Sequence, residues 1–280
     1  MTRAWVILVL LAGAPAIAAA QTASSSSDHG FWRRWFERSD RAKAAQPHWI
    51  TPLATTTPRL EQEFRFDTVW QRKPDGAPIE SYGGGKGLEL IPFDPVEVIV
   101  GLPAYVVHDR APAQTGFGDL RILMKYRLAA RDEASGGYIV TAFVDLSAPT
   151  GSEANGVPRP VVTATLAYGK GFGRFDLQGT LAFGTPTSEV AALGRTLAWN
   201  NAVQYRLFGR LWPEVEVNST FFDRGTNDGR QQTFVTPGVV VGRLPLAGRL
   251  GLTLGAGVQI AVSRFRTSTH NAILSVRLPF

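Results

Sequence analysis

The stretch RLGLTLGAGVQIAV, residues 249–262, decides the fold class of this chain. Apolar residues occupy its even-numbered positions, from Leu250 to Val262, and glycine, threonine and glutamine fill most of the odd-numbered ones. Successive side chains of a β-strand point to opposite faces, so this period of two predicts a strand with one apolar face. That face contacts either the core of a soluble β-sandwich or lipid.

The first twenty residues predict a secretory signal peptide. Arg3 provides a positive start, residues 5–13 form an apolar stretch too short for a stable membrane anchor, and residues 18–20 are a small-residue cleavage site before Gln21. An uncleaved anchor is the alternative. No later run of about 18 apolar residues follows, so we expect an exported chain without a transmembrane helix.

Composition excludes some functions of this 280-residue chain. It contains no cysteine, so neither a disulfide framework nor thiolate chemistry is possible. Loss of Arg3 with the signal peptide lowers the formal net charge from +6 to +5. A charge this small on a chain of this size, together with export, argues against nucleic acid as a partner.

The period-two pattern recurs along the chain, in segments close to the 9 to 11 residues or so that a tilted strand needs to cross a membrane. Short turns are expected at residues 91–96, 130–137, 170–173, 208–212 and 243–248, alternating with longer connections such as 73–85, 148–160 and 184–196. This alternation is typical of outer-membrane barrels. The expected strands lie near residues 60–71, 86–93, 95–107, 117–128, 137–147, 160–170, 174–184, 198–208, 212–222, 232–242, 249–263 and 270–280.

The end of the chain separates the barrel from a periplasmic sandwich. The last strand alternates up to the terminal Phe280, whereas soluble domains usually fray at their ends. A terminal aromatic resembles the signal read by the outer-membrane barrel assembly machinery, so we assign Phe280 as an assembly signal. The sequence therefore predicts an all-β fold: an antiparallel transmembrane β-barrel of about twelve strands over residues 58–280, with outer-membrane lipid as a partner.

Residues 21–57 fall outside the barrel pattern and are interpreted as a linker and a short amphipathic helix. In FWRRWFERSDRAK, residues 31–43, Phe31 and Trp35 are four positions apart, as are Trp32 and Phe36, with charged residues around them. The helix either lies on the inner leaflet surface or folds into the lumen as a plug. A disordered N-terminus is the alternative.

Charged residues alternate with apolar ones on several expected strands. A charge on the lipid face near the midplane costs about 2 to 4 kcal/mol, so these side chains are predicted to point into the lumen. They form either a polar pore lining or an internal salt-bridge network that plugs the barrel. The set is Glu61, Glu63, Arg65, Asp67, Arg121, Lys125, Arg127, Arg206, Glu214, Glu216 and Arg277.

Catalytic and metal-binding residues are not expected. The four histidines show no ligand spacing, so we predict no metal and no cofactor. Ser268 and His270 share a strand face, as a nucleophile and its base would in an outer-membrane lipid hydrolase. The alternative is a polar extracellular loop, and because a third, orienting group must also align, we predict that the chain is not an enzyme.

Several segments resemble one family. They are TPLATTTPRLEQEFRFD (51–67), GGGKGLELIP (83–92), GFGDLRILMKYRL (116–128), YIVTAFVDLSAPTGS (138–152), LAWNNAVQYRL (197–207), LWPEVEVN (211–218) and the closing RLPF. Together they resemble bacterial outer-membrane proteins labelled transporters or "MetA-pathway of phenol degradation" proteins. The resemblance implies a barrel that passes small, often hydrophobic solutes, with no catalytic residues. We therefore expect a passive channel or uptake protein; a lipid hydrolase using Ser268 and His270, or a plugged structural barrel, are the alternatives.

Overall fold

The computed structural model describes residues 27–84, 86–152 and 155–280. The predicted signal peptide, residues 1–20, and the start of the predicted linker lie outside the described residues. None of the helices in the described part is long and apolar enough to cross a membrane.

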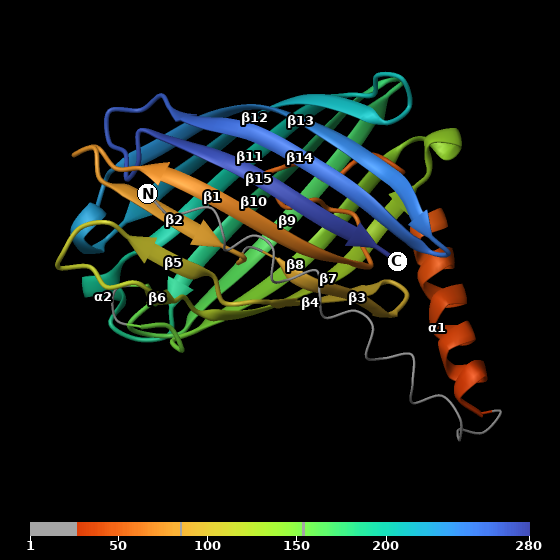
Figure 1. The fold of residues 1–280 in the computed structure, drawn as a ribbon, viewed down its shortest axis with the longest axis horizontal. Helices are drawn as coiled ribbons and strands as arrows, with labels where there is room; N and C mark the ends of the chain where they lie inside the picture. The colour runs from red at the N-terminus through yellow and green to blue at the C-terminus, as the bar shows by residue number, and fades with distance from the viewer. Residues whose placement is uncertain (1–26, 85, 153–154) are drawn as a thin grey trace, which may run out of the picture. The chain divides into compact units, whose positions relative to one another are not determined.

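Fifteen strand segments make up one antiparallel sheet in the described ranges (Figure 1). They are β1 (Glu63–Arg72), β2 (Pro78–Tyr82), β3 (Gly87–Phe93), β4 (Val96–Gly101), β5 (Tyr105–His108), β6 (Gly116–Phe117), β7 (Leu120–Arg131), β8 (Tyr138–Ala148), β9 (Val161–Phe172), β10 (Phe175–Pro186), β11 (Arg195–Tyr205), β12 (Leu211–Asp223), β13 (Gln231–Ala247), β14 (Leu250–Ala261) and β15 (His270–Pro279). The helices are α1 (Ser27–Ala44) and the short α2 (Val190–Leu193), with single 3-10 turns at Glu133–Ser135 and Gly225–Asn227.

The sheet closes on itself because β15 pairs with β1 over ten residues, from Glu63 opposite Pro279 to Arg72 opposite His270. Three pairs of segments, β2 with β3, β4 with β5 and β6 with β7, each act as one interrupted strand, since β2 pairs with β5 and β3 with β4. The closed wall thus has twelve strands, as predicted. Closure leaves no sheet edge, the only β arrangement that lipid tolerates.

The interruptions correct two predictions. Residues 73–85 were expected to form a long loop, but Pro78–Tyr82 form β2 and pair with the end of β1. Residues 95–107 were expected to form one strand, which is broken at 102–104. Gly83 and Gly84 adopt positive φ, at 75° and 76°, and a Cβ on Gly84 would lie 2.7 Å from the Ala104 Cβ. Glycine at this position therefore allows the two interrupted strands to approach closely, a feature that alternation does not reveal.

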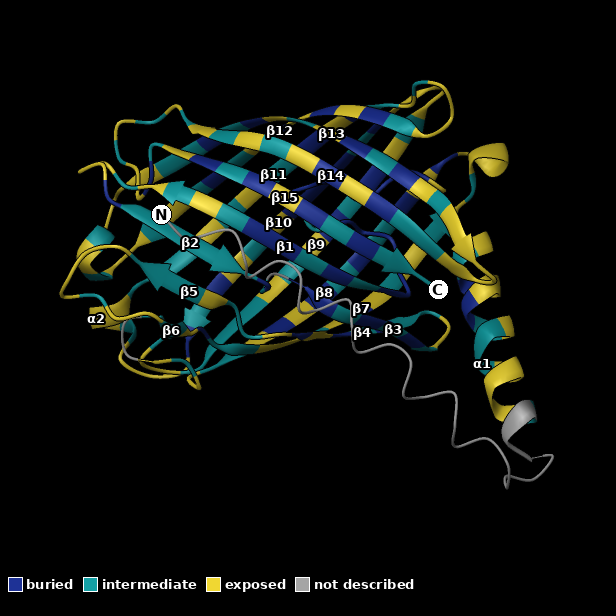
Figure 2. Cartoon of the chain, viewed as in Figure 1, coloured by how far each residue is buried: buried dark blue, intermediate teal, exposed yellow. Residues whose placement is uncertain are grey.

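The two faces of the wall have inverted polarity compared with a soluble sandwich (Figure 2). On β14, Leu254, Val258 and Ile260 are 39%, 43% and 44% exposed, while Thr253 is 2% exposed and Gly255 is buried. The apolar face of the opening stretch therefore points outward and its polar, glycine-rich face points into the barrel. A soluble sandwich would place the apolar face inside.

The predicted N-terminal helix is present as α1. The chain divides into two compact units, one up to Glu37 and one from Arg38 to Phe280. In the first unit, Phe31 and Trp35 have ring centroids 6.2 Å apart. In the second unit, the end of α1 contacts the end of the barrel that carries the short turns, where Lys43 Nζ donates to the Phe280 carbonyl at 3.3 Å.

Candidate functional site

Residues 45–62, here called the inner segment, run through the lumen of the barrel. Hydrogen bonds link this segment to β1, β4, β7, β8, β10, β12 and β15. These strands are distributed around the closed sheet, so one segment meets them all only from inside. Trp49, Ile50 and Leu53 are 4%, 4% and 3% exposed. Residues 45–57, which fall outside the strand pattern of the sequence, thus lie inside the barrel.

Three prolines explain why the inner segment has no regular structure. Pro47, Pro52 and Pro58 lack an N–H donor and disfavour helix and sheet ladders. The carbonyls left without ladder partners need other donors. Two arginines of the wall supply them.

Arg277 on β15 and Arg65 on β1 hold the middle of the inner segment. Arg277 donates to the Thr51 carbonyl at 2.5 Å and to the Pro52 carbonyl at 2.9 Å. Arg65 donates through Nη2 to the Leu53 carbonyl at 2.5 Å. A planar guanidinium with several donors suits this bridging of adjacent carbonyls. Both side chains are 3% or less exposed, so water competes little for these bonds.

Two glutamates of β12 bind the N–H groups of the same region. Glu216 accepts from Ala54 N at 2.7 Å and from Thr55 N at 2.5 Å, and Glu214 Oε1 accepts from Leu53 N at 3.0 Å. Carboxylate acceptors strengthen such hydrogen bonds. The donors and acceptors of this short stretch are thus satisfied by different strands of the wall.

Buried ion pairs hold the last part of the inner segment. Arg59 lies 2.9 Å from Glu61, and Lys125 on β7 lies 3.0 Å from Glu97 on β4, with both partners of that pair fully buried. Lys125 Nζ also donates to the Arg59 carbonyl at 3.0 Å. The two pairs therefore form one connected network between the segment and the wall.

Leu53 occupies a gap formed by glycines of β13 and β14. A Cβ on Gly238 or Gly255 would lie 2.5 Å from a Leu53 methyl carbon, and one on Gly257 would lie 2.7 Å from it. Real Cβ atoms do not approach this closely, so only glycine leaves room for the leucine. The glycine-rich face of residues 249–262 therefore accommodates the Leu53 side chain.

The other large apolar side chains of the inner segment also meet glycines. A Cβ on Gly242 would lie 2.4 Å from Ile50, and one on Gly169 or Gly171 would lie 2.7 or 2.8 Å from the Trp49 ring. Ile50 and Trp49 belong to the same buried apolar cluster. Apolar packing of these side chains against glycine thus adds to the hydrogen bonds that charged side chains make with the backbone of the segment.

Eight of the eleven residues predicted to line the lumen are buried inside the barrel. Glu61 lies on the inner segment itself and not on the wall, because β1 starts at Glu63. The eight are Glu61, Glu63, Arg65, Asp67, Lys125, Glu214, Glu216 and Arg277.

The other three predicted residues lie toward the ends of the barrel. Arg127 donates to Asp94 at 2.5 Å, near the short turns, and Arg121 pairs with Asp145 while 46% of its side chain is exposed. Arg206 lies just beyond the end of β11 and is exposed, and its guanidinium lies over the ring of the buried Trp212, 6.0 Å from the ring centroid.

Sequence reasoning missed several buried charges, among them Glu89, Glu97 and Lys86. Glu89 and Glu97 are 0% exposed and alternate with leucine and valine on expected strands, so the rule that found Glu63 applies to them too. Lys86, 8% exposed, follows the glycines at the interruption, where no alternation signals its direction. It borders a cavity of about 40 Å³ with Thr56, Arg121 and Asp145. A space of this size holds water but no organic solute.

The structure does not bring Ser268 and His270 together as a catalytic pair. Within the described ranges no hydrogen bond joins them; His270 Nδ1 lies 3.1 Å from Thr269 Oγ1, and Ser268 is 4% exposed. A nucleophile needs both a base and access to substrate. In the same ranges no group of three or more histidine, cysteine or acidic side chains is arranged to hold a metal ion.

Comparison with known proteins identifies the architecture. No family model matches this chain, and no curated protein does. A solved structure, the COG4313 outer membrane channel from Pseudomonas putida F1, is similar with a TM-score of 0.56, covering 82% of this chain and 98% of that chain. The two proteins share a fold. At 16% sequence identity, the likeness carries the barrel architecture alone.

Proposed function

We propose that this chain is an outer-membrane barrel for uptake of small compounds, hydrophobic and aromatic ones among them, and not an open pore for hydrophilic solutes. The observation that carries the proposal is the inner segment, which is bonded to seven strands and fills the lumen. A filled lumen leaves no wide aqueous path. The family resemblance and the channel-like fold support the same role.

An outer-membrane location is supported by the surface of the wall. Met124, Leu128, Val144 and Trp199 are 50% or more exposed on the outer face, whereas Lys125 on β7 and Asp145 on β8 are buried. In water such a belt would promote aggregation, and in lipid it is stabilising. In this setting Phe280 would be read by the barrel assembly machinery, and the short turns would face the periplasm.

The interrupted strands favour a route through the wall for hydrophobic compounds. Three neighbouring strands break between β2 and β3, between β4 and β5 and between β6 and β7, so the ladder of hydrogen bonds is less complete there, although Gly118 N still donates to the Ala104 carbonyl at 2.8 Å. Ladder bonds hold a barrel wall closed, and fewer of them make local opening less costly. A compound soluble in lipid would then bypass the filled lumen.

A designed disulfide tests this route, because the chain has no other cysteine. Tyr82 on β2 and Tyr105 on β5 oppose each other beside the interruption. The double variant Tyr82→Cys with Tyr105→Cys should therefore form a disulfide that joins the two strands there. In cells with an intact lipopolysaccharide leaflet, we expect the wild type to accelerate uptake of the hydrophobic dye N-phenylnaphthylamine without accelerating sugar uptake. Oxidation of the stapled variant should abolish that gain, and reduction should restore it.

The matched control is Leu181→Cys with Trp199→Cys, an opposed pair in the uninterrupted wall. Oxidation of this control should leave dye uptake unchanged. Equal inhibition of both stapled variants would rule out a route at the interruption. If wild-type cells took up dye no faster than cells without the barrel, or gained sugar uptake, the proposed function itself would be wrong.

A further inference from the structure

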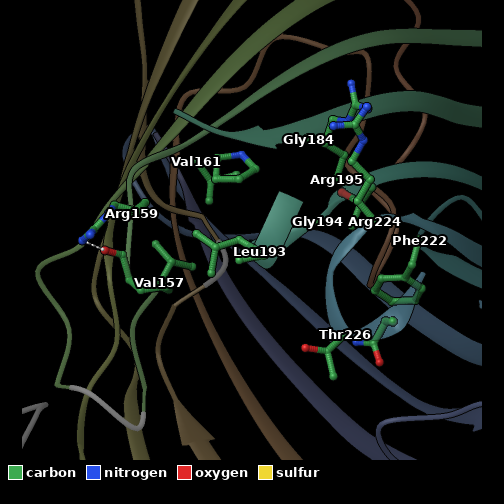
Figure 3. A pocket seen from close by; sticks show the side chains of 15 residues that line it. Val157, Arg159, Val161, Gly184, Leu193, Gly194, Arg195, Phe222, Arg224 and Thr226 are labelled. Atoms are coloured by element: carbon green, nitrogen blue, oxygen red, sulfur yellow. Dashed lines mark hydrogen bonds between the residues drawn. The ribbon is translucent and has the colours of Figure 1, made fainter. Parts of the chain in front are cut away.

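A cavity of about 330 Å³ lies at the end of the barrel that carries the long connections (Figure 3). Its walls come from the β8–β9, β10–β11 and β12–β13 connections and from the adjoining strand ends. Val161, Leu193 and Phe222 give it an apolar wall, and three arginines but no acidic residue border it. Its volume is at the small end of the range of about 300 to 1,000 Å³ typical of ligand sites.

Strand register places this cavity on the inner side of the wall. Gly184 opposes Thr196 across β10 and β11, and Thr196 opposes Phe222 across β11 and β12. Directly opposed residues share a face of the sheet, and Gly184 shares its face with the buried Gln178, six positions earlier on β10. A solute approaching the lumen from this end passes the cavity.

Two glycines fix the backbone of the cavity. Gly194 and Gly225 adopt positive φ, at 81° and 66°, and a Cβ on Gly225 would lie 2.8 Å from Gly194 N. The β10–β11 and β12–β13 connections therefore touch through backbone atoms at these positions. The contact preforms one wall of the cavity, so a ligand need not order it.

The three arginines differ in how far their charge is satisfied. Arg159 is held by Glu189, at 2.6 and 3.1 Å, and Figure 3 shows it across the cavity from Arg195 and Arg224. Arg195 pairs with Asp223 at 2.9 Å, yet its Nε is buried without a hydrogen-bond partner.

Arg224 is the least satisfied of the three. Within the described part of the chain, its guanidinium makes no hydrogen bond and no ion pair. Its backbone N–H donates to Asp228 Oδ1 at 2.6 Å, which holds the residue in place. The cavity thus combines an apolar wall with a free cation.

We propose that this cavity binds small carboxylates that carry an aromatic or branched apolar body. Arg224 would receive the carboxylate, since arginine donates to planar anions in a fork, and Leu193 and Phe222 would contact the apolar body. The proposal deepens the proposed function, on which it rests, by naming a substrate class and its first binding site. Binding to the cavity can nevertheless be measured without measuring uptake.

The assay is isothermal titration of the full chain, folded in nonionic detergent, with 3-phenylpropanoate. We expect saturable binding that Arg224→Gln weakens about tenfold, the scale of one lost charge-assisted hydrogen bond. Leu193→Asn should weaken 3-phenylpropanoate but not acetate, because Leu193, 39% exposed, serves only the apolar body.

Arg266→Gln is the matched control, since it removes an exposed arginine from the same end of the barrel without touching the cavity. It should leave the Kd unchanged. Equal weakening by Arg224→Gln and Arg266→Gln, or equally tight binding of the neutral 3-phenylpropanol, would overturn the carboxylate site. Displacement of the ligand by equimolar inorganic phosphate would show an unselective anion site and also overturn it.

Dye uptake separates failure of the site from failure of the proposed function. Specific binding by a barrel that does not accelerate dye uptake would uphold the site and overturn the uptake role. Accelerated dye uptake without carboxylate binding would do the reverse.

Discussion

The inner segment meets two kinds of wall. On β1, β4, β7 and β15 it contacts charged side chains, as where Arg277 donates to the Thr51 carbonyl and Lys125 to the Arg59 carbonyl. On β13 and β14 it contacts glycines, whose missing side chains leave space for Leu53, and one charged side chain, Arg243, which donates to the His48 and Trp49 carbonyls at 2.8 Å, adds to this contact. The charged wall fixes the segment through directed bonds that are costly to leave unmade, and the glycine wall fixes it through shape. The inner segment is thus held by directed polar contacts and by packing against glycine, and mutation can test these two contributions separately.

The largest effect is expected at the charged wall. Lys125→Met leaves Glu97 buried without its cation, which should lower the free energy of unfolding by about 3 to 5 kcal/mol. Urea unfolding from lipid vesicles measures it. The double variant Lys125→Met with Glu97→Gln should recover much of the loss, because no uncompensated charge stays buried. A double variant as unstable as the single one would show that burial of Glu97 is not the cause.

A smaller effect is expected at the glycine wall. Gly255→Leu inserts side-chain atoms where Leu53 already lies, an overpacking that should cost about 1 to 3 kcal/mol. It should also displace the inner segment and increase ion conductance in planar bilayers. Adding Leu53→Ala should restore stability and low conductance. Conductance that does not respond to Gly255→Leu would show that the glycine wall does not hold the segment.

A third type of contact, a solvent-exposed ion pair, should contribute less to the free energy of unfolding than the buried ion pairs. Asp40 at the end of α1 pairs with Arg249 at 2.5 and 3.0 Å, and both side chains are more than 40% exposed. The hydrogen bond from Arg249 lowers the pKa of Asp40 despite an opposing effect of partial burial. Asp40→Asn should therefore cost less than about 1 kcal/mol, reduced further by salt.

The lowered pKa of Asp40 sets the sign of a pH effect. A depressed folded-state pKa stabilises the protein above the ordinary aspartate pKa of about 3.9, and this contribution is lost as the pH falls through the folded-state value. The stability difference between wild type and Asp40→Asn should shrink in urea titrations at progressively lower acidic pH. A difference that grew toward low pH would contradict this assignment.

The smallest effect is expected for Ser268→Ala and His270→Ala. In the described ranges the two side chains make no hydrogen bond to each other or to the inner segment. Dye uptake should match the wild type, and no lipid hydrolysis should be lost in an assay of phospholipid cleavage. Loss of a lipase activity in both variants would revive the hydrolase alternative.

The sequence by itself determined the wall. Alternation in residues 249–262 and the strands like it predicted the strand number and which side chains share a face, because the side-chain direction of a strand depends on local period alone. The export signal and the terminal Phe280 then predicted a closed barrel whose apolar face meets lipid. The same alternation identified Glu63, Arg65 and Lys125 as inward-facing charges.

Only the tertiary structure decided what fills the lumen. Residues 45–57 carry no alternation, and their place is set by partners far away in the chain, such as Glu216 for Thr55 and Gly255 for Leu53. In the sequence Gly255 is only a small residue on a polar face. The sequence does not show which side chain fills the space beside it, because that neighbour is set by the tertiary structure. The cavity arginines likewise come from separate segments of the chain, and only the closed register of the sheet brings them to one site.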